Sequence, residues 1–176
     1  MLTIMLLDLT RIRRSTDELD RVIEPSGLPQ EGEAYRVVAP VHLRCGIHKD
    51  HARFRLTGSV NGEMELDCSR CLEPYRLPVS MTFDHRYLPL TEASAAGEKE
   101  IEEDDFETSY YQDDQIDLAE LVREQFYLAL PMKPLCAEDC KGLCPQCGTN
   151  LNLTRCGCVR DWEDPRLAAL KSIADN

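Results

Sequence analysis

The residues best suited to chemistry in this 176-residue chain are its nine cysteines, six of which fall between positions 136 and 158. The sharpest motif among them is Cys144-Pro-Gln-Cys147-Gly148. Two thiolates separated by two residues can hold one metal ion, and the following glycine allows a sharp turn that aims backbone N–H groups at the sulfurs. The motif therefore predicts one half of a tetrahedral metal site.

Two cysteine pairs could supply the other half of this site. The downstream pair, Cys156 and Cys158, has the separation of a zinc ribbon and is the preferred choice, whereas the upstream pair, Cys136 and Cys140, would give a more compact loop. Zinc is favoured over an iron–sulfur cluster because nothing in the sequence indicates an electron-transfer partner. A site with four protein ligands has no open position, so the expected role of the zinc is structural.

A second C-x2-C motif, Cys68-Ser-Arg-Cys71, stands apart from the tail at the end of a predicted strand. A thiol redox pair would need a thioredoxin-like βαβ setting, which the surrounding sequence does not offer. The pair could also be half of a second metal site, completed by Cys45, His48 or His51 or by the two tail thiols that the first site leaves over. The simplest interpretation is a pair of buried thiols at a turn. All three remain open at this point.

No other pattern in the sequence points to catalysis. It contains no P-loop, no nucleophile elbow and no His-Glu-x-x-His motif, so we expect a protein that is not an enzyme. The N-terminal stretch has its apolar residues before its arginines, the reverse of a secretory signal, which predicts a cytoplasmic location. Thiols stay reduced there, and this favours metal binding over a disulfide framework. No apolar run approaches the length of a membrane span, and no small-molecule substrate is evident.

The chain is acidic, with a net charge of −12, which argues against a generally basic nucleic-acid-binding surface. Much of the acidic charge lies between Glu98 and Glu124. Such a run is typical of a solvated loop. The alternative is an acidic arm that binds a basic partner such as a ribosomal protein.

The spacing of apolar residues predicts an α+β fold, with an antiparallel sheet or a partly open barrel in the N-terminal half. Apolar and polar residues alternate over four stretches, residues 35–45, 52–60, 63–68 and 75–88. The Asn61-Gly62 pair predicts a hairpin turn between two of these strands. Residues 10–28 are expected to be helical or irregular.

Three regions follow from this pattern: an antiparallel β domain over 1–90, an acidic loop or linker over 91–116, and a helix with the cysteine-rich module over 117–176, packed on the β domain. Asp117 is expected to begin the helix as its N-cap, with Glu120 as its capping-box partner. The apolar face of this helix is expected to consist of Leu118, Leu121, Val122, Leu128 and Ala129. Asp164-Pro165 predicts the start of a short C-terminal helix.

Four arginines alternate with the apolar residues of the predicted strands and should lie on the outward side of the sheet: Arg36, Arg44, Arg53 and Arg55. They could form a local basic face that contacts RNA phosphates, with a steep salt dependence. Ordinary solvent-facing arginines with acidic neighbours fit the pattern equally well.

Several motifs, taken in order, resemble a known family: LDCSRCLEPYRLPV, IDLAELVREQFYLALPMKPLC, CKGLCPQCGTNLN, CGC and DPRLAAL. Through them most of the chain resembles the YceD family of large ribosomal RNA subunit accumulation proteins, in a version with a cysteine-rich C-terminus. The resemblance implies a non-enzymatic role in ribosome biogenesis, supporting accumulation of large-subunit (23S) ribosomal RNA by binding that RNA or a basic ribosomal protein. Some family members lack the cysteine-rich tail, which would make the metal auxiliary.

A rival from another class is a thiol redox or metal-handling protein that uses Cys68 and Cys71. It predicts a readily reducible disulfide between these two residues.

Overall fold

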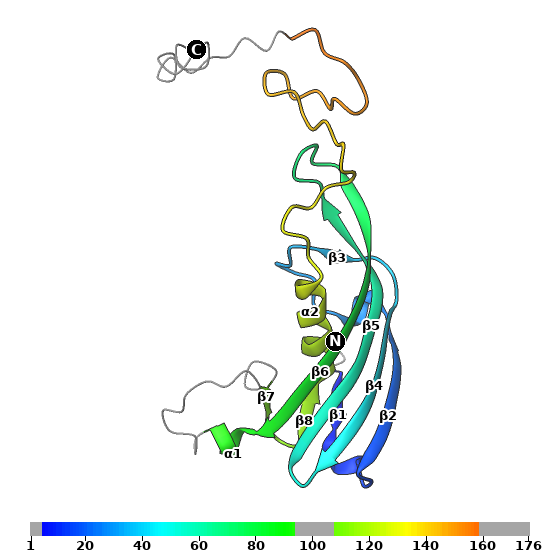
Figure 1. Cartoon of the computed structure of the whole chain (residues 1–176), viewed down its shortest axis with the longest axis vertical. Coiled ribbons are helices and arrows are strands. Elements are labelled where there is room, and N and C mark those ends of the chain that lie inside the picture. The colour runs from blue at the N-terminus through cyan, green and yellow to red at the C-terminus, as the bar shows by residue number, and fades with distance from the viewer. Residues whose placement is uncertain (1–4, 94–107, 159–176) are drawn as a thin grey trace, which may run out of the picture.

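The main body of the protein is a long curved sheet. The computed structural model describes residues 5–93 and 108–158. Within them the strands of this sheet are β2 (Thr16–Ile23), β3 (Arg36–Val37), β4 (Val41–Asp50), β5 (Arg53–Asp67), β6 (Pro74–Pro89) and β7 (Thr108–Tyr111). Strands β2, β4, β5, β6 and β7 lie side by side in that order, and the short β3 pairs with the far end of β5 (Figure 1).

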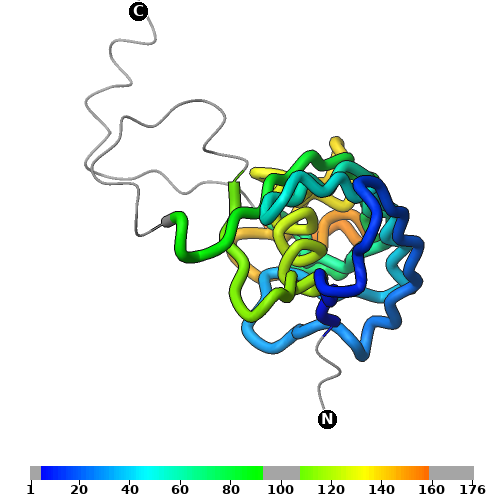
Figure 2. The backbone as a smooth tube through the Cα atoms, turned by 90° about the horizontal axis from the view of Figure 1, so that it is seen from below, coloured from blue at the N-terminus to red at the C-terminus, as the bar shows by residue number. Residues whose placement is uncertain are grey.

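The remaining elements are short. Strands β1 (Leu6–Asp8) and β8 (Gln115–Asp117) pair with each other, and the helices are α1 (Leu90–Ala93) and α2 (Leu118–Leu128), with 3-10 turns η1 (Leu9–Arg11) and η2 (Pro25–Gly27). Seen from below, the strands curve around α2 (Figure 2). The sheet does not close, so it is an open sheet rather than a barrel, and it is mixed because β7 runs parallel to β6.

The core lies between the inner face of the sheet and α2. Alternate residues of the long strands point inward, as predicted, and are buried: Val41, Leu43, Cys45, Phe54, Leu56, Val60, Met64 and Leu66. The outward residues of the same strands are mostly exposed and polar. This separation of faces is what the period-2 pattern predicts for a sheet with one solvated side.

Helix α2 begins where the sequence places it. The Asp117 carboxylate accepts hydrogen bonds from the N–H groups of Ala119 and Glu120, at 2.8 and 3.2 Å, so Asp117 is the N-cap. The buried face of the helix consists of Leu118, Leu121, Val122, Gln125 and Phe126. The prediction of Leu128 on this face is wrong, because Leu128 is the last residue of the helix and is 64% exposed.

The prediction of a hairpin turn at Asn61-Gly62 is also wrong. Strand β5 runs straight through these residues, and Asn61 is paired with β4 on one side and β6 on the other. Gly62 faces inward, where a Cβ atom would lie 3.0 Å from Cζ of Phe126 and 3.2 Å from Cγ2 of Val41. The glycine therefore makes room for α2 to pack on the sheet.

The turns lie elsewhere. His51, with φ of 56°, turns the chain between β4 and β5, and Leu72, with φ of 60°, belongs to the turn between β5 and β6. Residues 16–23 form edge strand β2 rather than a helix or an irregular segment. Their alternation is weak because most of their side chains are exposed on this edge strand, which is the setting in which charged residues discourage further pairing.

Strand β7 falls within the predicted linker over 91–116 and β8 begins in it, and β7 is the last strand of the sheet. The predicted C-terminal helix that begins at Asp164-Pro165 lies outside the described residues, as does most of the acidic run before Thr108. None of the described helices is long and apolar enough to cross a membrane.

Candidate metal centre

Eight of the nine cysteines meet at one end of the elongated molecule. The turn between β5 and β6 carries Cys68 and Cys71, and the cysteine-rich segment after α2 lies beyond this turn, at the upper end of Figure 1. The turn is shaped by two backbone hydrogen bonds, from Cys68 N–H to the Glu73 carbonyl and from Leu72 N–H to the Cys68 carbonyl, both 2.9 Å. It holds both thiols on the side that faces the tail, where Cys68 is fully buried and Cys71 is 3% exposed.

Eight of the nine cysteines gather in two groups of four. The first, which we call the junction cluster, consists of Cys68, Cys71, Cys136 and Cys140. The second, the tail cluster, consists of Cys144, Cys147, Cys156 and Cys158. Within each group the four sulfurs lie within 4.8 Å of one another. The tail cluster is the set that the sequence analysis preferred, and the upstream pair Cys136 and Cys140 joins the turn instead.

The junction cluster has the dimensions of a tetrathiolate site. The Sγ atoms of Cys68 and Cys140 are 3.8 Å apart, and those of Cys71 and Cys136 are 3.7 Å apart. A zinc–sulfur distance of about 2.3 Å places two sulfurs of a regular tetrahedron about 3.8 Å apart. A disulfide would need about 2.05 Å. The donor set and its spacing therefore fit a zinc ion.

The tail cluster is built from the Cys144–Cys147 knuckle and the Cys156–Cys158 pair. Gly148 N–H donates to the Cys144 carbonyl at 2.9 Å, and Cys144 N–H donates to the Thr149 carbonyl at 2.8 Å, which folds the Cys144–Cys147 knuckle back on itself. Gly148 has φ of 72°, the left-handed conformation that the sequence analysis expected a glycine to supply. The second pair, Cys156 and Cys158, is half-buried, so this cluster is more open to solvent than the junction cluster.

Each cluster contains a thiol that ionises readily. Burial opposes ionisation of Cys68, but hydrogen bonds from backbone N–H groups, chiefly that of Cys71, outweigh it and lower the pKa of Cys68 to about 6. Hydrogen bonds from the hydroxyl and N–H groups of Thr149 lower the pKa of Cys147 to about 6. The Thr149 hydroxyl lies 3.1 Å from the Cys147 sulfur. A thiolate is the form that binds a metal ion. Hydrogen bonding with Cys140 raises the pKa of Cys136 to about 12, and hydrogen bonding with Cys147 raises the pKa of Cys158 to about 12, so only part of each ligand set is ionised near neutral pH.

Three of the residues considered from sequence belong to neither cluster. Cys45 is buried in the core of the sheet, and this burial raises the pKa of its thiol to about 11. His51 lies in the β4–β5 turn, 2.8 Å from the Asp50 carboxylate, and His48 is exposed on the outer face of β4. The surplus thiols of the tail, rather than these residues, complete the group around Cys68 and Cys71.

The four arginines proposed as an RNA-facing surface are all exposed on the outer face, and each is paired with an acid. Arg36 pairs with Glu65, Arg44 with Asp20 at 3.0 Å, Arg53 with Glu92 at 3.3 Å, and Arg55 with Asp84. The last pair is bidentate, with distances of 2.7 and 2.5 Å. The positive charge at these positions is therefore balanced locally.

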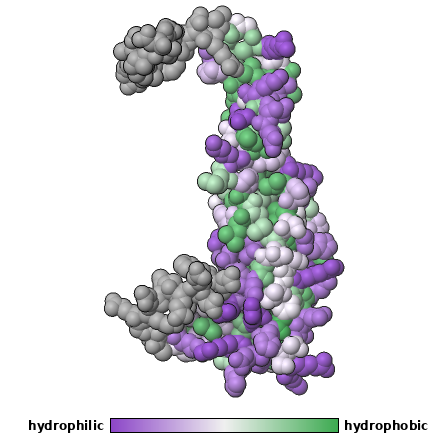
Figure 3. All heavy atoms as spheres, in the orientation of Figure 1, coloured by the Kyte–Doolittle hydropathy of each residue, from purple (hydrophilic) through white to green (hydrophobic). Residues whose placement is uncertain are grey.

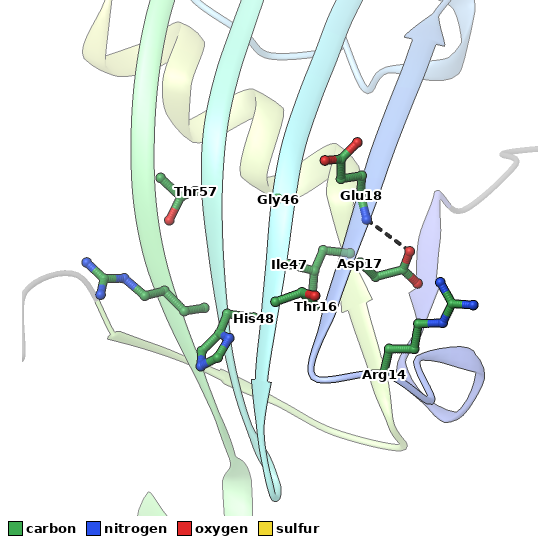
Figure 4. Close-up of a pocket in the computed structure, with 9 residues that line it drawn as sticks. Arg14, Thr16, Asp17, Glu18, Gly46, Ile47, His48 and Thr57 are labelled. Carbon is green, nitrogen blue, oxygen red and sulfur yellow. Dashed lines mark hydrogen bonds between the residues drawn. The ribbon is translucent and has the colours of Figure 1, made fainter.

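The outer face also carries a shallow hollow of about 550 Å³ over β2, β4 and β5 (Figure 4). Gly46 and Thr57 lie at its floor, and side chains of both charges surround it, including Arg14, Asp17 and Glu18. Apolar and polar side chains are interspersed on the face shown in Figure 3. The mixture of acidic and basic side chains around the hollow does not favour an anionic or a cationic ligand.

Comparison with known proteins identifies the family. The family described as "Large ribosomal RNA subunit accumulation protein YceD" matches residues 56–174. The chain belongs to the YceD family. The matched region of this YceD protein contains all eight cysteines of the two clusters and helix α2.

The relatives cover most of this YceD chain. An uncharacterized protein of Mycobacterium tuberculosis is 30% identical over 170 residues, which is 94% of this chain and 79% of the relative. The uncharacterized protein YlbN of Bacillus subtilis is 30% identical over 174 residues, which is 94% of this chain and 92% of the relative. A chloroplastic protein of Zea mays, named large ribosomal RNA subunit accumulation protein YCED homolog 1, is 30% identical over 159 residues, 76% of this chain and 53% of the relative. No solved structure matches the chain.

Proposed function

We propose that this protein is a ribosome-biogenesis factor that supports accumulation of large-subunit (23S) ribosomal RNA in the cytoplasm by binding, without catalysing a reaction. The observation that carries the proposal is membership of the YceD family, together with the name of the Zea mays relative. The clustered thiols are consistent with a non-catalytic role, because a metal held by four protein ligands has no open position for a substrate or a water molecule.

The charge distribution of the chain favours a basic ribosomal protein over exposed RNA phosphates as its direct partner. The chain has a net charge of −12, and each of the four outward arginines singled out from the sequence already faces an acid. Phosphate binding by these four arginines would compete with the ion pairs, whereas a partner rich in Lys and Arg gains from the acidic charge without disturbing them.

A structural zinc ion at the tail cluster is part of this proposal. Cys144, Cys147, Cys156 and Cys158 supply four thiols close together, which is the ligand set of structural zinc sites. In this role the ion would fold the module and take no part in a reaction. Elemental analysis of protein purified under reducing conditions should find zinc, and serine at positions 144 and 147 should remove one equivalent.

The function is tested in cells that make the full-length protein at its normal level. Gradient sedimentation followed by immunodetection should find the protein with large-subunit precursors, and its depletion should lower the ratio of large-subunit to small-subunit ribosomal RNA. A protein that stays free of ribosomal particles during fast growth, with an unchanged RNA ratio on depletion, contradicts the proposal. Crosslinking in the same cells identifies the partner as protein or RNA, and a steep salt dependence of complex formation with free RNA would favour RNA.

A further inference from the structure

The junction cluster joins parts of the chain that are far apart in sequence. Cys68 and Cys71 belong to the turn at the end of the sheet, whereas Cys136 and Cys140 follow helix α2. The tail cluster, in contrast, draws all its members from residues 144–158. A single ion in the junction cluster would therefore bridge two structural parts, and one in the tail cluster would organise a single short segment.

Hydrogen bonds around the junction cluster hold the turn and the tail together. Ser69 N–H donates to the Pro134 carbonyl at 2.8 Å, and Leu143 N–H donates to the Arg70 carbonyl at 3.0 Å. The Arg70 guanidinium in turn donates to the Cys140 carbonyl at 2.9 Å and the Glu138 carbonyl at 3.2 Å. These bonds set the orientation of the two parts so that the four sulfurs converge.

Apolar packing contributes little at this place. The buried group at the junction consists of three of the thiols themselves, Cys68, Cys71 and Cys140, with the half-buried Tyr75 and Leu135 packed against them. The three thiols are not part of the main core of the sheet, and Tyr75 packs against both groups. The Sγ–Sγ distances of 3.7 and 3.8 Å match those between neighbouring ligands of one zinc ion, so a divalent cation would hold the four cysteines together where apolar packing does not.

The second coordination layer also matches a thiolate site. The Asn152 side-chain amide donates to the Cys140 sulfur at 3.2 Å, and the amide oxygen of the same side chain accepts from Lys141 N–H at 2.8 Å. Hydrogen bonds to a ligand atom fix its direction and balance its charge. Asn152 belongs to the segment between the two pairs of the tail cluster, so it links the two clusters.

We propose that Cys68, Cys71, Cys136 and Cys140 bind a second zinc ion, which fastens the cysteine-rich module to the end of the sheet. The protein then holds two zinc ions with different roles: the junction ion positions the module on the β5–β6 turn, and the tail ion folds the module itself. This inference deepens the zinc part of the proposed function and is independent of the ribosomal role.

The zinc content of the full-length protein tests the proposal first. The wild type should contain two equivalents, and both the Cys68→Ser/Cys71→Ser and the Cys144→Ser/Cys147→Ser variants should contain one. Cys45→Ala is the matched control, since it removes a thiol outside both clusters, and it should keep two. One equivalent in the wild type, or a Cys68–Cys71 disulfide in protein kept reduced, overturns the proposal.

Hydrogen exchange tests the fastening role. The peptide containing the Ser69 N–H should lose protection in the Cys68→Ser/Cys71→Ser variant and keep it in the Cys144→Ser/Cys147→Ser variant, while the central strands β4 and β5 stay protected in both. Equal protection of Ser69 in the two variants overturns the fastening role.

The zinc contents also separate the two sites. If the Cys144→Ser/Cys147→Ser variant retains both equivalents of zinc and the Cys68→Ser/Cys71→Ser variant does not, the tail cluster is not a zinc site, as assumed under the proposed function, and the junction site stands.

Cobalt titration of the metal-free wild type covers the case in which a variant does not fold. The intense thiolate-to-cobalt absorption and the visible bands of tetrahedral cobalt should rise to two equivalents. Saturation at one equivalent contradicts a second tetrathiolate site.

Discussion

Two glycines with the same backbone conformation make the contact between module and sheet measurable. Gly142 and Gly148 both have φ of 72°. A Cβ atom at Gly148 would meet nothing within 4 Å, whereas one at Gly142 would lie 2.9 Å from the carbonyl oxygen of Arg70 and 3.2 Å from its Cβ. Alanine at either position incurs the same conformational strain, so the difference between the two variants isolates the contact with Arg70.

The magnitudes follow from these distances. Alanine in the left-handed region costs about 1–2 kcal/mol in either variant. Gly142→Ala also forces apart the Arg70 carbonyl and Leu143 N–H, which are hydrogen-bonded at 3.0 Å, and such overpacking typically costs a further 1–3 kcal/mol or so. Since metal binding and folding of a small module are coupled, the cost should appear as weaker zinc binding. Gly142→Ala should therefore lose roughly five- to hundredfold more affinity than Gly148→Ala.

The assay is competition of each full-length variant with a chromophoric zinc chelator at fixed pH, with the Ser69 exchange rate as a local readout. Gly142→Ala should speed exchange at Ser69 and Gly148→Ala should leave it unchanged. Equal losses of affinity in the two variants, or a greater loss in Gly148→Ala, would refute the reasoning, because the Arg70 contact would then contribute nothing.

Three further predictions concern the core, acid stability and metal removal. Gly62→Val should destabilise the fold by about 2 kcal/mol through overpacking against Phe126, and Phe126→Leu should partly rescue it in a double-mutant cycle measured by urea unfolding; additive effects would contradict direct contact. The hydrogen bond from Arg55 holds the pKa of Asp84 below its usual range, so the stability from this pair is present above about pH 4 and is lost as the pH falls further. The free energy of unfolding of Asp84→Asn should therefore fall less steeply with decreasing pH than that of the wild type. Parallel curves for the two proteins would contradict this. After the metal is removed with a chelator and without denaturant, eight of the nine thiols should react quickly with a thiol reagent. Cys45 should react slowly, because Cys45 is buried and the pKa of its thiol is about 11. Nine equal rates would show that removing the metal unfolds the sheet.

The local elements were predictable because local interactions specify them. Alternation along β4 and β6 shows directly which residues face the core, and Asp117 caps α2 through bonds to residues two and three positions away. Edge strand β2 was missed because its exposed side chains leave only weak alternation. The exposed Leu128 was misplaced on the buried face, and Phe126, which is fully buried, was overlooked.

Asn61-Gly62 shows where local chemistry is overridden. The pair can form a tight turn, but it lies in the middle of a strand that is hydrogen-bonded on both sides. The glycine is required by the ring of Phe126, which lies more than sixty residues along the chain. A residue chosen for a distant packing partner cannot be told from a turn residue by its neighbours in sequence.

For the cysteines, too, the sequence determines some features and the tertiary structure determines others. The C-x2-C spacings and Gly148 determine from sequence alone that short knuckles able to hold a metal ion can form, because each knuckle is closed by bonds within a few residues. Which knuckles share an ion depends on where the β5–β6 turn meets the chain that leaves α2, and that is set by the length and curvature of the sheet. The sequence left open whether the two surplus tail thiols stay unused or complete a second site with Cys68 and Cys71, and the tertiary structure places Cys136 and Cys140 beside that pair.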